Sequence, residues 1–186
     1  TMERGRQLLA DADVDVDSES AEIEDAAVLN RLSPPVQRWW VEQFGAAVPT
    51  NGGFFTPPQR EAIPLIQDDA NPLICAPTGS GKTLASFTAI IDELVRRDRE
   101  EGLEDTVYCL YVSPLKSLAN DIHRNLTEPL EGIDDQLTAE EPANTDEQAQ
   151  EGIDIRHAIR HGDTDDRKRQ RMLETPPHIL NTTPET

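Results

Sequence analysis

The stretch APTGSGKT, which ends at Thr83, carries residue types suited to binding a phosphate group. Gly79 and Gly81 allow main-chain φ angles that bulkier residues avoid, so consecutive N–H groups can point at phosphate oxygens. Lys82 supplies a positive charge for the β and γ phosphates of a nucleotide, and Thr83 supplies a hydroxyl ligand for Mg²⁺. Ala76 stands where many such loops have glycine, but the remaining pattern predicts a nucleotide-binding loop.

A glutamine side chain precedes this loop in the stretch FTPPQREAIPLI. The amide of Gln59 offers both a donor and an acceptor, as recognition of an adenine edge requires. Taken alone, Gln59 is typical of an ordinary helix surface, but its place ahead of a phosphate loop favours contact with the base. The residues expected to bind ATP are Gln59, Pro77, Thr78, Gly79, Ser80, Gly81, Lys82 and Thr83.

The elements that must position these residues alternate between strands and helices. Apolar runs predict strands at residues 71–77, 106–114, 153–162 and 177–184, and helical spacing predicts helices at 82–97, at 117 up to the region of Pro129, and at 165–173. The run at 106–114 is almost continuously apolar and β-branched, as in a strand buried on both faces. This alternation predicts an α/β fold with a parallel sheet and with functional sites at the carboxyl ends of its strands.

Two acidic stretches flank or interrupt this pattern. Residues 11–25 hold eight carboxylates and no basic residue, so residues 1–30 are expected to form a flexible, acidic N-terminal arm. A second acidic and polar stretch, at about 138–152, predicts a surface insertion. The folded domain is therefore expected over residues 31–186.

The overall charge is unusual for a protein that binds nucleic acid, because the net charge is −19 and the pI is near 4.4. Only three of its 17 basic residues are lysines. Acidic, lysine-poor sequence resembles proteins of extreme halophiles, in which salt screens self-repulsion, since the Debye length falls to about 3 Å at 1 M. An acidic mesophilic protein is the alternative.

The cysteines and the hydropathy of the sequence indicate where in the cell the protein is expected. Cys75 and Cys109 fall inside apolar runs and are expected to be buried, reduced thiols rather than a disulfide or a metal pair. No apolar run approaches the roughly 20 residues that span a bilayer, and the N-terminus has no apolar signal segment. A cytoplasmic protein without membrane contact is expected.

Five stretches resemble, in order, the Q motif, motif I, motif Ia, the GD-containing segment and motif Ib of superfamily 2 helicases. They are FTPPQREAIPLI, APTGSGKT, YVSPLKSLAND, RHGDT and PPHILNTTPET. The sequences of these motifs are similar to those of the large helicase-related (Lhr) family of DNA helicases, whereas a DEAD-box RNA helicase would show PTREL in place of SPLKSLAND. The resemblance implies a partial RecA-like domain that uses ATP and Mg²⁺, with Lys82 and Thr83 as catalytic residues. It also implies movement along one DNA strand, 3′ to 5′, on single-stranded or partly duplex DNA, with RNA as the alternative.

The resemblance further assigns nucleic-acid contacts to residues that follow the expected strands. These residues are Ser113, Pro114, Leu115, Lys116, Arg160, Gly162, Thr182, Thr183, Pro184 and Glu185. Backbone N–H groups, hydroxyls and cations at strand ends and helix starts suit the phosphates of a nucleic acid. Plain strand-to-helix turns are the alternative interpretation.

ATP hydrolysis also requires an acidic pair, motif II, which should end a strand beside the phosphate loop. Asp92 and Glu93 lie within the helix that follows the loop, and Asp146 and Glu147 lie in the acidic insertion, so neither pair fits. In the helicase family motif II follows the TTPE segment, and the chain stops at Thr186. We therefore expect a domain truncated before motif II, inactive without the second RecA-like domain of the same protein. A P-loop kinase and a non-catalytic nucleotide-binding protein stay open as alternatives.

Overall fold

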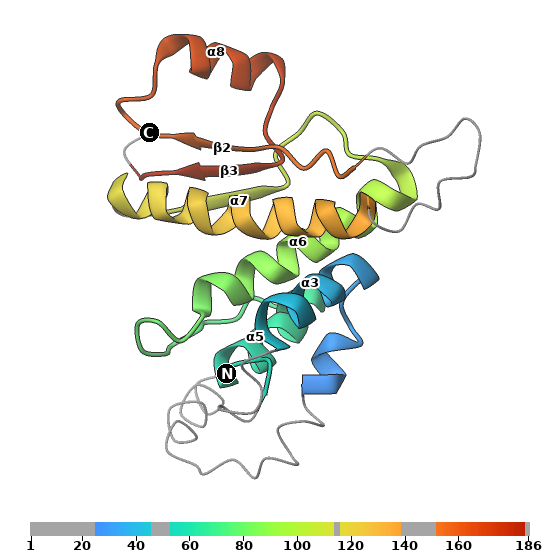
Figure 1. Ribbon diagram of the computed structural model, residues 1–186. Helices are drawn as coiled ribbons and strands as arrows, with labels where there is room; N and C mark the ends of the chain where they lie inside the picture. Colours follow the sequence, from blue (N-terminus) through green and yellow to red (C-terminus); the bar gives the residue numbers. More distant parts are fainter. Residues whose placement is uncertain (1–24, 46–52, 114–115, 139–151, 185–186) are drawn as a thin grey trace, which may run out of the picture. The chain divides into compact units, whose positions relative to one another are not determined.

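The computed structural model describes residues 25–45, 53–113, 116–138 and 152–184 (Figure 1). The chain divides into two compact units, Thr1–Glu93 and Leu94–Thr186. The long helix α6 (Lys82–Glu101) crosses the boundary between them. No helix in the described ranges is long and apolar enough to cross a membrane.

The first unit is built from helices. It holds α3 (Pro34–Phe44), α5 (Pro57–Gln67) and the first part of α6. Its core combines aromatic and aliphatic side chains, because the ring centroids of Trp40 and Phe55 lie 4.4 Å apart and Val36 and Ile63 are fully buried. This core packs α3 against the start of the segment that holds α5, and no strand lies among the described residues of this unit.

One buried carboxylate connects three helices of the first unit. Asp92 on α6 accepts a hydrogen bond of 2.6 Å from the Ser33 N–H and one of 2.8 Å from the Gln67 side-chain amide. Ser33 is the N-cap of α3, so Asp92 satisfies an N–H group that the helix itself leaves without a partner. The carboxylate has a structural use inside a helix, which agrees with setting Asp92 aside as a motif II residue.

The strand expected at residues 71–77 is absent. This segment has no regular secondary structure, Leu73 is 83% exposed, and Cys75 is exposed as well. A strand persists only where a neighbouring backbone satisfies its N–H and C=O groups, and no strand among the described residues pairs with this segment. The expected strand and the expected burial of the Cys75 thiol are both wrong here.

The expected acidic arm, residues 1–30, includes residues that are folded at its carboxyl-terminal end. Residues 25–29 are helical, and Asp25 and Val28 are 2% and 4% exposed. Residues 1–24 lie outside the described residues. Charge pattern alone misplaced this boundary, because it could not show that Asp25 has a buried partner.

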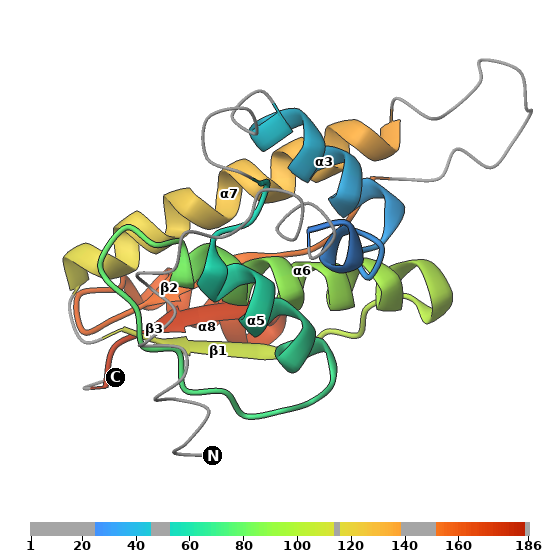
Figure 2. The same cartoon turned by 90° about the horizontal axis from the view of Figure 1, so that it is seen from below.

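The second unit contains a three-stranded parallel sheet. Its strands are β1 (Cys109–Val112), β2 (His157–Arg160) and β3 (Ile179–Thr182), in the order β1-β3-β2 (Figure 2). The connections from β1 to β2 and from β2 to β3 cross the sheet in opposite directions. Right-handed crossovers therefore place α7 (Lys116–Thr138) and α8 (Asp166–Glu174) on opposite faces. The predicted α/β architecture with a parallel sheet is confirmed.

Two details of this unit differ from expectation. Leu110 and Val112 are 59% and 52% exposed, so β1 is not buried on both faces. Helix α7 runs past Pro129 to its end at Thr138, although an internal proline costs about 3 kcal/mol. The buried side chains of Leu126, Leu130 and Ile133 keep α7 helical on both sides of the proline.

Candidate nucleotide loop and nucleic-acid edge

The glycine-rich loop of the first unit has a backbone that only glycine adopts freely. Gly79 and Gly81 both have φ of 81°, in the left-handed region. A Cβ built at Gly79 meets nothing within 4 Å, whereas one at Gly81 would overlap the side-chain amide of Gln59. Gly79 therefore leaves open space beside the loop, and Gly81 permits the close approach of Gln59.

Lys82 and Thr83 form the start of α6, directly after the loop. The Lys82 ammonium donates to the carbonyl oxygens of Ala76 at 2.5 Å and Pro77 at 2.6 Å, so it lies against the loop backbone. A helix N-terminus and an ammonium are a donor set that fits a phosphate group, and the Thr83 hydroxyl fits one Mg²⁺ ligand. No group of three or more His, Cys, Asp or Glu within the described ranges could hold a metal.

Two side chains near the start of α5 hold the loop. The Thr56 hydroxyl donates to the Ser80 carbonyl at 2.8 Å, and the Gln59 amide donates to the Gly81 carbonyl at 3.4 Å. The Gln59 carbonyl oxygen accepts from the Thr56 N–H at 2.8 Å, within a capping box. Gln59 is 4% exposed, so it is no ordinary helix-surface residue. Sequence analysis missed Thr56, although its T-x-x-Q spacing is the signature of that cap.

A buried ion pair supports the chain just ahead of Thr56. Asp25 accepts from the Arg60 guanidinium at 2.5 Å and from the Phe54 N–H, and the two charged side chains are only 3% and 10% exposed. Gly53 makes room for the pair, because a Cβ there would overlap both side chains. No sequence pattern links Asp25 to Arg60, which lie 35 positions apart.

The strand ends of the second unit bring several predicted nucleic-acid contacts to one edge. Val112 and Arg160 are both in register with Thr182. The Ser113 N–H continues the ladder by donating to the Thr182 carbonyl at 2.9 Å. Because the strands are parallel, the residues that follow them share the same edge of the sheet. We call Ser113, Arg160, Thr182 and Thr183 the sheet edge.

Burial separates the members of the sheet edge. Ser113 and Thr183 are 1% and 2% exposed, so their hydroxyls are packed inside, whereas Arg160 and Thr182 are half-buried. The Arg160 Nε has no hydrogen-bond partner among the described residues. Gly162 is exposed, and its carbonyl accepts from Arg169 at 2.7 Å. Arg160 and Thr182 are therefore the more accessible side chains of the edge.

Several expected residues cannot be placed in this way. Pro114, Leu115, Glu185, Asp146 and Glu147 lie outside the described residues, as does most of the expected insertion at 138–152. Lys116 is the first residue of α7, but its side chain is outside the described part. Pro184 is exposed beyond β3.

Comparisons with known proteins identify the family of this chain. The model of the DEAD/DEAH box helicase family matches residues 56–186. The ATP-dependent helicase Lhr-Core of Methanocaldococcus jannaschii is 47% identical over 165 residues, which are 89% of this chain and 18% of that protein. The Lhr-Core helicase of Methanothermobacter thermautotrophicus is 48% identical over 155 residues, 83% of this chain and 16% of that protein.

A solved structure gives the same result. The helicase Lhr of Mycobacterium smegmatis, bound to ssDNA and AMP-PNP, is 38% identical with a TM-score of 0.66, covering 85% of this chain and 18% of that one. The chain thus spans less than a fifth of the length of these relatives. The match to the family model over residues 56–186 shows that this chain belongs to the DEAD/DEAH box helicases, with Lhr helicases among its relatives.

Proposed function

We propose that the protein carrying this chain is an ATP-dependent DNA helicase or translocase of the cytoplasm. In this proposal the chain binds ATP and Mg²⁺ through the glycine-rich loop and part of one DNA strand through the sheet edge. The observation that carries the proposal is the loop itself, with two glycines at φ of 81° ahead of Lys82 and with Thr56 and Gln59 bonded to its carbonyls.

Gln59 would serve both the base and the loop. Its bond to the Gly81 carbonyl is long, at 3.4 Å, so adenine can compete for the same amide. If adenine replaced the Gly81 carbonyl as the acceptor for this amide, the loop would respond to the base, because Gly81 directly precedes Lys82. The proposed ATP contacts are Gln59, Pro77, Thr78, Gly79, Ser80, Gly81, Lys82 and Thr83, with Thr83 also on Mg²⁺.

DNA is favoured over RNA by two observations. The segment after β1 reads SPLKSLAND, as in the Lhr resemblance, and the related Lhr structure is described as bound to ssDNA. Phosphate contacts position a strand without reading its sequence. The sheet edge, with Lys116, Gly162, Pro184 and the neighbouring Pro114, Leu115 and Glu185, would therefore bind single strands of any sequence.

Substitution of the loop lysine tests the nucleotide half of the proposal. In the full-length protein, Lys82→Ala should abolish ATP turnover and lower the thermal unfolding midpoint only slightly, since Lys82 bonds two loop carbonyls but is not a core residue. Arg99→Ala, which removes the same charge from an exposed site near the end of α6, should leave turnover unaffected. Substantial ATPase activity in the Lys82→Ala protein would end the motor interpretation.

Substitution at the start of α7 tests the DNA half. Lys116→Ala should weaken binding to oligo-dT and to mixed-sequence single strands by the same factor, because a phosphate contact carries no sequence information. Oligo-rU of equal length provides the RNA arm. If the variant loses ATP affinity while DNA binding stays intact, Lys116 contacts the nucleotide, and its assignment to DNA is wrong.

A further inference from the structure

Helix α8 carries a cluster of cations in a chain whose net charge is −19. Between Arg160 and Arg171 there are five basic and three acidic residues. At about 100° per residue along a helix, Arg167, Lys168 and Arg171 fall within an arc of about 100°. Asp166 lies outside this arc, and Glu174, the last residue of α8, lies at its margin, about 20° from Arg167. We call these three side chains the α8 cation face.

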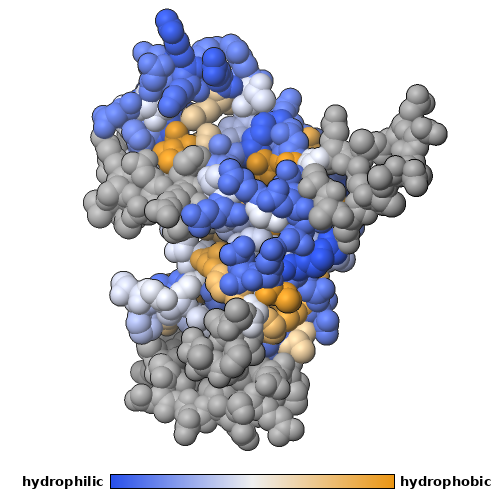
Figure 3. All heavy atoms as spheres, in the orientation of Figure 1, coloured by the Kyte–Doolittle hydropathy of each residue, from blue (hydrophilic) through white to orange (hydrophobic). Residues whose placement is uncertain are grey.

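The α8 cation face has no ion-pair partner among the residues that the structure describes. Four arginines elsewhere each pair with a carboxylate: Arg31, Arg60, Arg97 and Arg156. By contrast, the side chains of Arg167, Lys168 and Arg171 are exposed and make no ion pair or hydrogen bond with any residue that the structure describes. Helix α8 buries none of its residues, and its surface in Figure 3 is hydrophilic. Carboxylates are in twofold excess in this chain, yet these three neighbouring cations have no carboxylate partner among the described residues.

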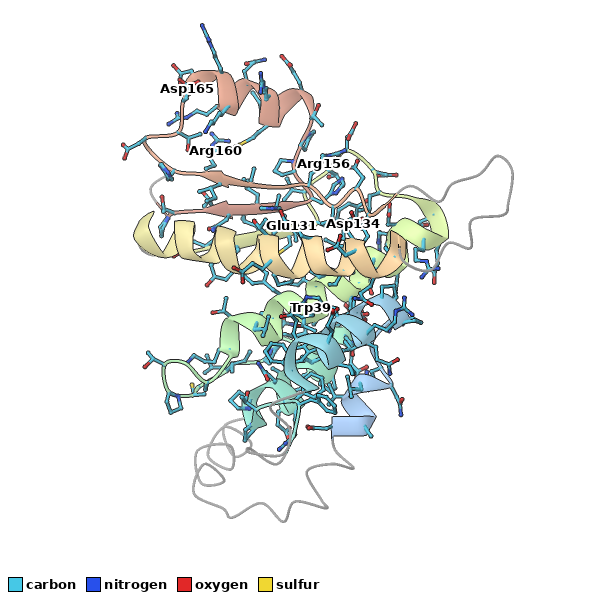
Figure 4. The ribbon with its side chains drawn as sticks, in the orientation of Figure 1. Trp39, Glu131, Asp134, Arg156, Arg160 and Asp165 are labelled. Carbon is cyan, nitrogen blue, oxygen red and sulfur yellow. The ribbon has the colours of Figure 1, made fainter. Side chains whose placement is uncertain are left out.

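A fourth arginine places α8 beside the sheet edge. Arg169 donates from Nε to the Thr164 carbonyl at 2.9 Å and from Nη2 to the Gly162 carbonyl at 2.7 Å. These bonds tie the helix to the loop that follows β2, whose last residue is Arg160. Figure 4 shows Arg160 and Asp165 at the end of the sheet where β2 and β3 finish. Helix α8 therefore begins next to the sheet edge.

The flank of α8, rather than its end, is the part open to a ligand. The Asp165 side chain accepts from the Arg167 N–H at 2.9 Å and caps the first turn. A carboxylate already occupies the helix N-terminus and repels a phosphate there. The cations project from the side of the helix, where exposed Arg and Lys contact phosphates without sequence preference.

We propose that the α8 cation face is a second phosphate-binding surface, which holds single-stranded DNA where the strand leaves the sheet edge. The inference rests on the proposed function and extends it, because it gives the strand a path beyond the motif residues. A local positive surface attracts a polyanion even when the rest of the chain is acidic. It also gives a ligand to three cations that have no ion-pair partner among the described residues.

The test is the salt dependence of DNA binding by the full-length protein. For single strands, log K falls with log salt with a slope of about −0.7 per phosphate contact. The R167Q/K168Q/R171Q variant should bind fluorescein-labelled oligo-dT more weakly at low KCl and should reduce the slope by about 2, if three contacts are lost. A control variant, R31Q/R97Q/R99Q, removes the same charge from other positions and should keep the wild-type slope.

The outcomes separate this inference from the proposed function. If the wild-type protein does not bind oligo-dT, the proposed function fails. If it binds, and the R167Q/K168Q/R171Q variant keeps the wild-type affinity and slope, the α8 inference is overturned alone. Equal weakening in the control variant also overturns it, since bulk charge would then be the cause. Weakened binding to oligo-rU only would refute the choice of DNA. The three side chains make no described contacts, so an unchanged thermal midpoint checks the fold.

Discussion

The glycine-rich loop and the sheet edge are held in place by different kinds of bond. In the first unit, single side chains hold the loop: Thr56 and Gln59 donate to its carbonyls, and the Asp25–Arg60 pair supports the chain ahead of them. In the second unit, paired strand backbones align the sheet edge. A strand ladder consists of many main-chain hydrogen bonds, which remain when a side chain is replaced. A side-chain hydrogen bond is lost when its residue is replaced. The loop should therefore be far more sensitive to single substitutions than the edge.

Removal of the buried carboxylate should have the largest effect. Asp25→Ala leaves the Arg60 charge buried without a partner, which costs about 3–5 kcal/mol of unfolding free energy. Asp68→Ala breaks the exposed Arg31–Asp68 pair, and such pairs are worth only about 0–1 kcal/mol. Urea titration of both variants measures the difference. Equal destabilisation would mean that the Asp25–Arg60 pair does not support the first unit.

The two loop glycines offer a second, smaller contrast. Both Gly79→Ala and Gly81→Ala force a side chain into the left-handed region, at about 1–2 kcal/mol each. Gly81→Ala must also displace the Gln59 amide, whereas the space around Gly79 is open. ATP affinity should therefore fall further in Gly81→Ala, as titration with a fluorescent ATP analogue would measure. Equal losses would show that Gln59 does not support the loop.

The same contrast explains which features the sequence could predict. The loop and the T-x-x-Q cap are local patterns, since their residues are neighbours in the chain. Helix α6 begins at Lys82 as expected, and the cap could have been predicted from its spacing although it was missed. The segment 71–77 has the composition of a strand, but strand formation depends on a partner elsewhere in the chain. The Asp25–Arg60 pair is equally non-local, because nothing in either stretch specifies the other. Local chemistry was therefore predictable, whereas pairing and burial required the structure.

A buried histidine makes the second unit sensitive to acid. His178, directly before β3, is fully buried. The Arg156 N–H donates to its Nδ1 at 3.2 Å, and the Arg156 guanidinium lies 2.9 Å from its Nε2. Burial lowers the pKa of His178, and the Arg156 charge lowers this pKa further. Asp154, Asp105 and Asp98 raise the pKa but do not cancel the shift.

The sign of the pH effect follows from that direction. The unfolded chain takes up a proton near pH 6.5, whereas the folded chain resists until lower pH. The stabilisation is therefore complete above pH 6.5 and is lost as the pH falls towards the folded pKa. Burial and Asp154 raise the pKa of Asp98, which acts in the opposite direction. Urea titrations should show a lower free energy of unfolding at pH 5.5 than at pH 7.5. His178→Gln should reduce this difference, and Asp98→Asn should not. If the difference is unchanged in His178→Gln, His178 is not the group responsible for the acid sensitivity.

Salt should weaken interactions between exposed charges and leave those between buried charges almost unchanged. We expect this to be the smallest of the predicted effects for any single contact. At 1 M salt the Debye length is about 3 Å, so repulsion among exposed carboxylates is largely screened, while a buried pair is screened much less. The net charge of −19 makes repulsion the dominant exposed interaction. Raising KCl from about 0.1 M to about 2 M, a range wide enough to shorten the Debye length severalfold, should therefore raise the thermal midpoint measured by circular dichroism. Sucrose at matched osmolality is the control, because it favours burial without screening charge. If the thermal midpoint rises in sucrose but not in KCl, the acidity of the chain has another cause. If the midpoint of Asp25→Ala also rises in KCl, the effect comes from the exposed carboxylates and not from the buried pair.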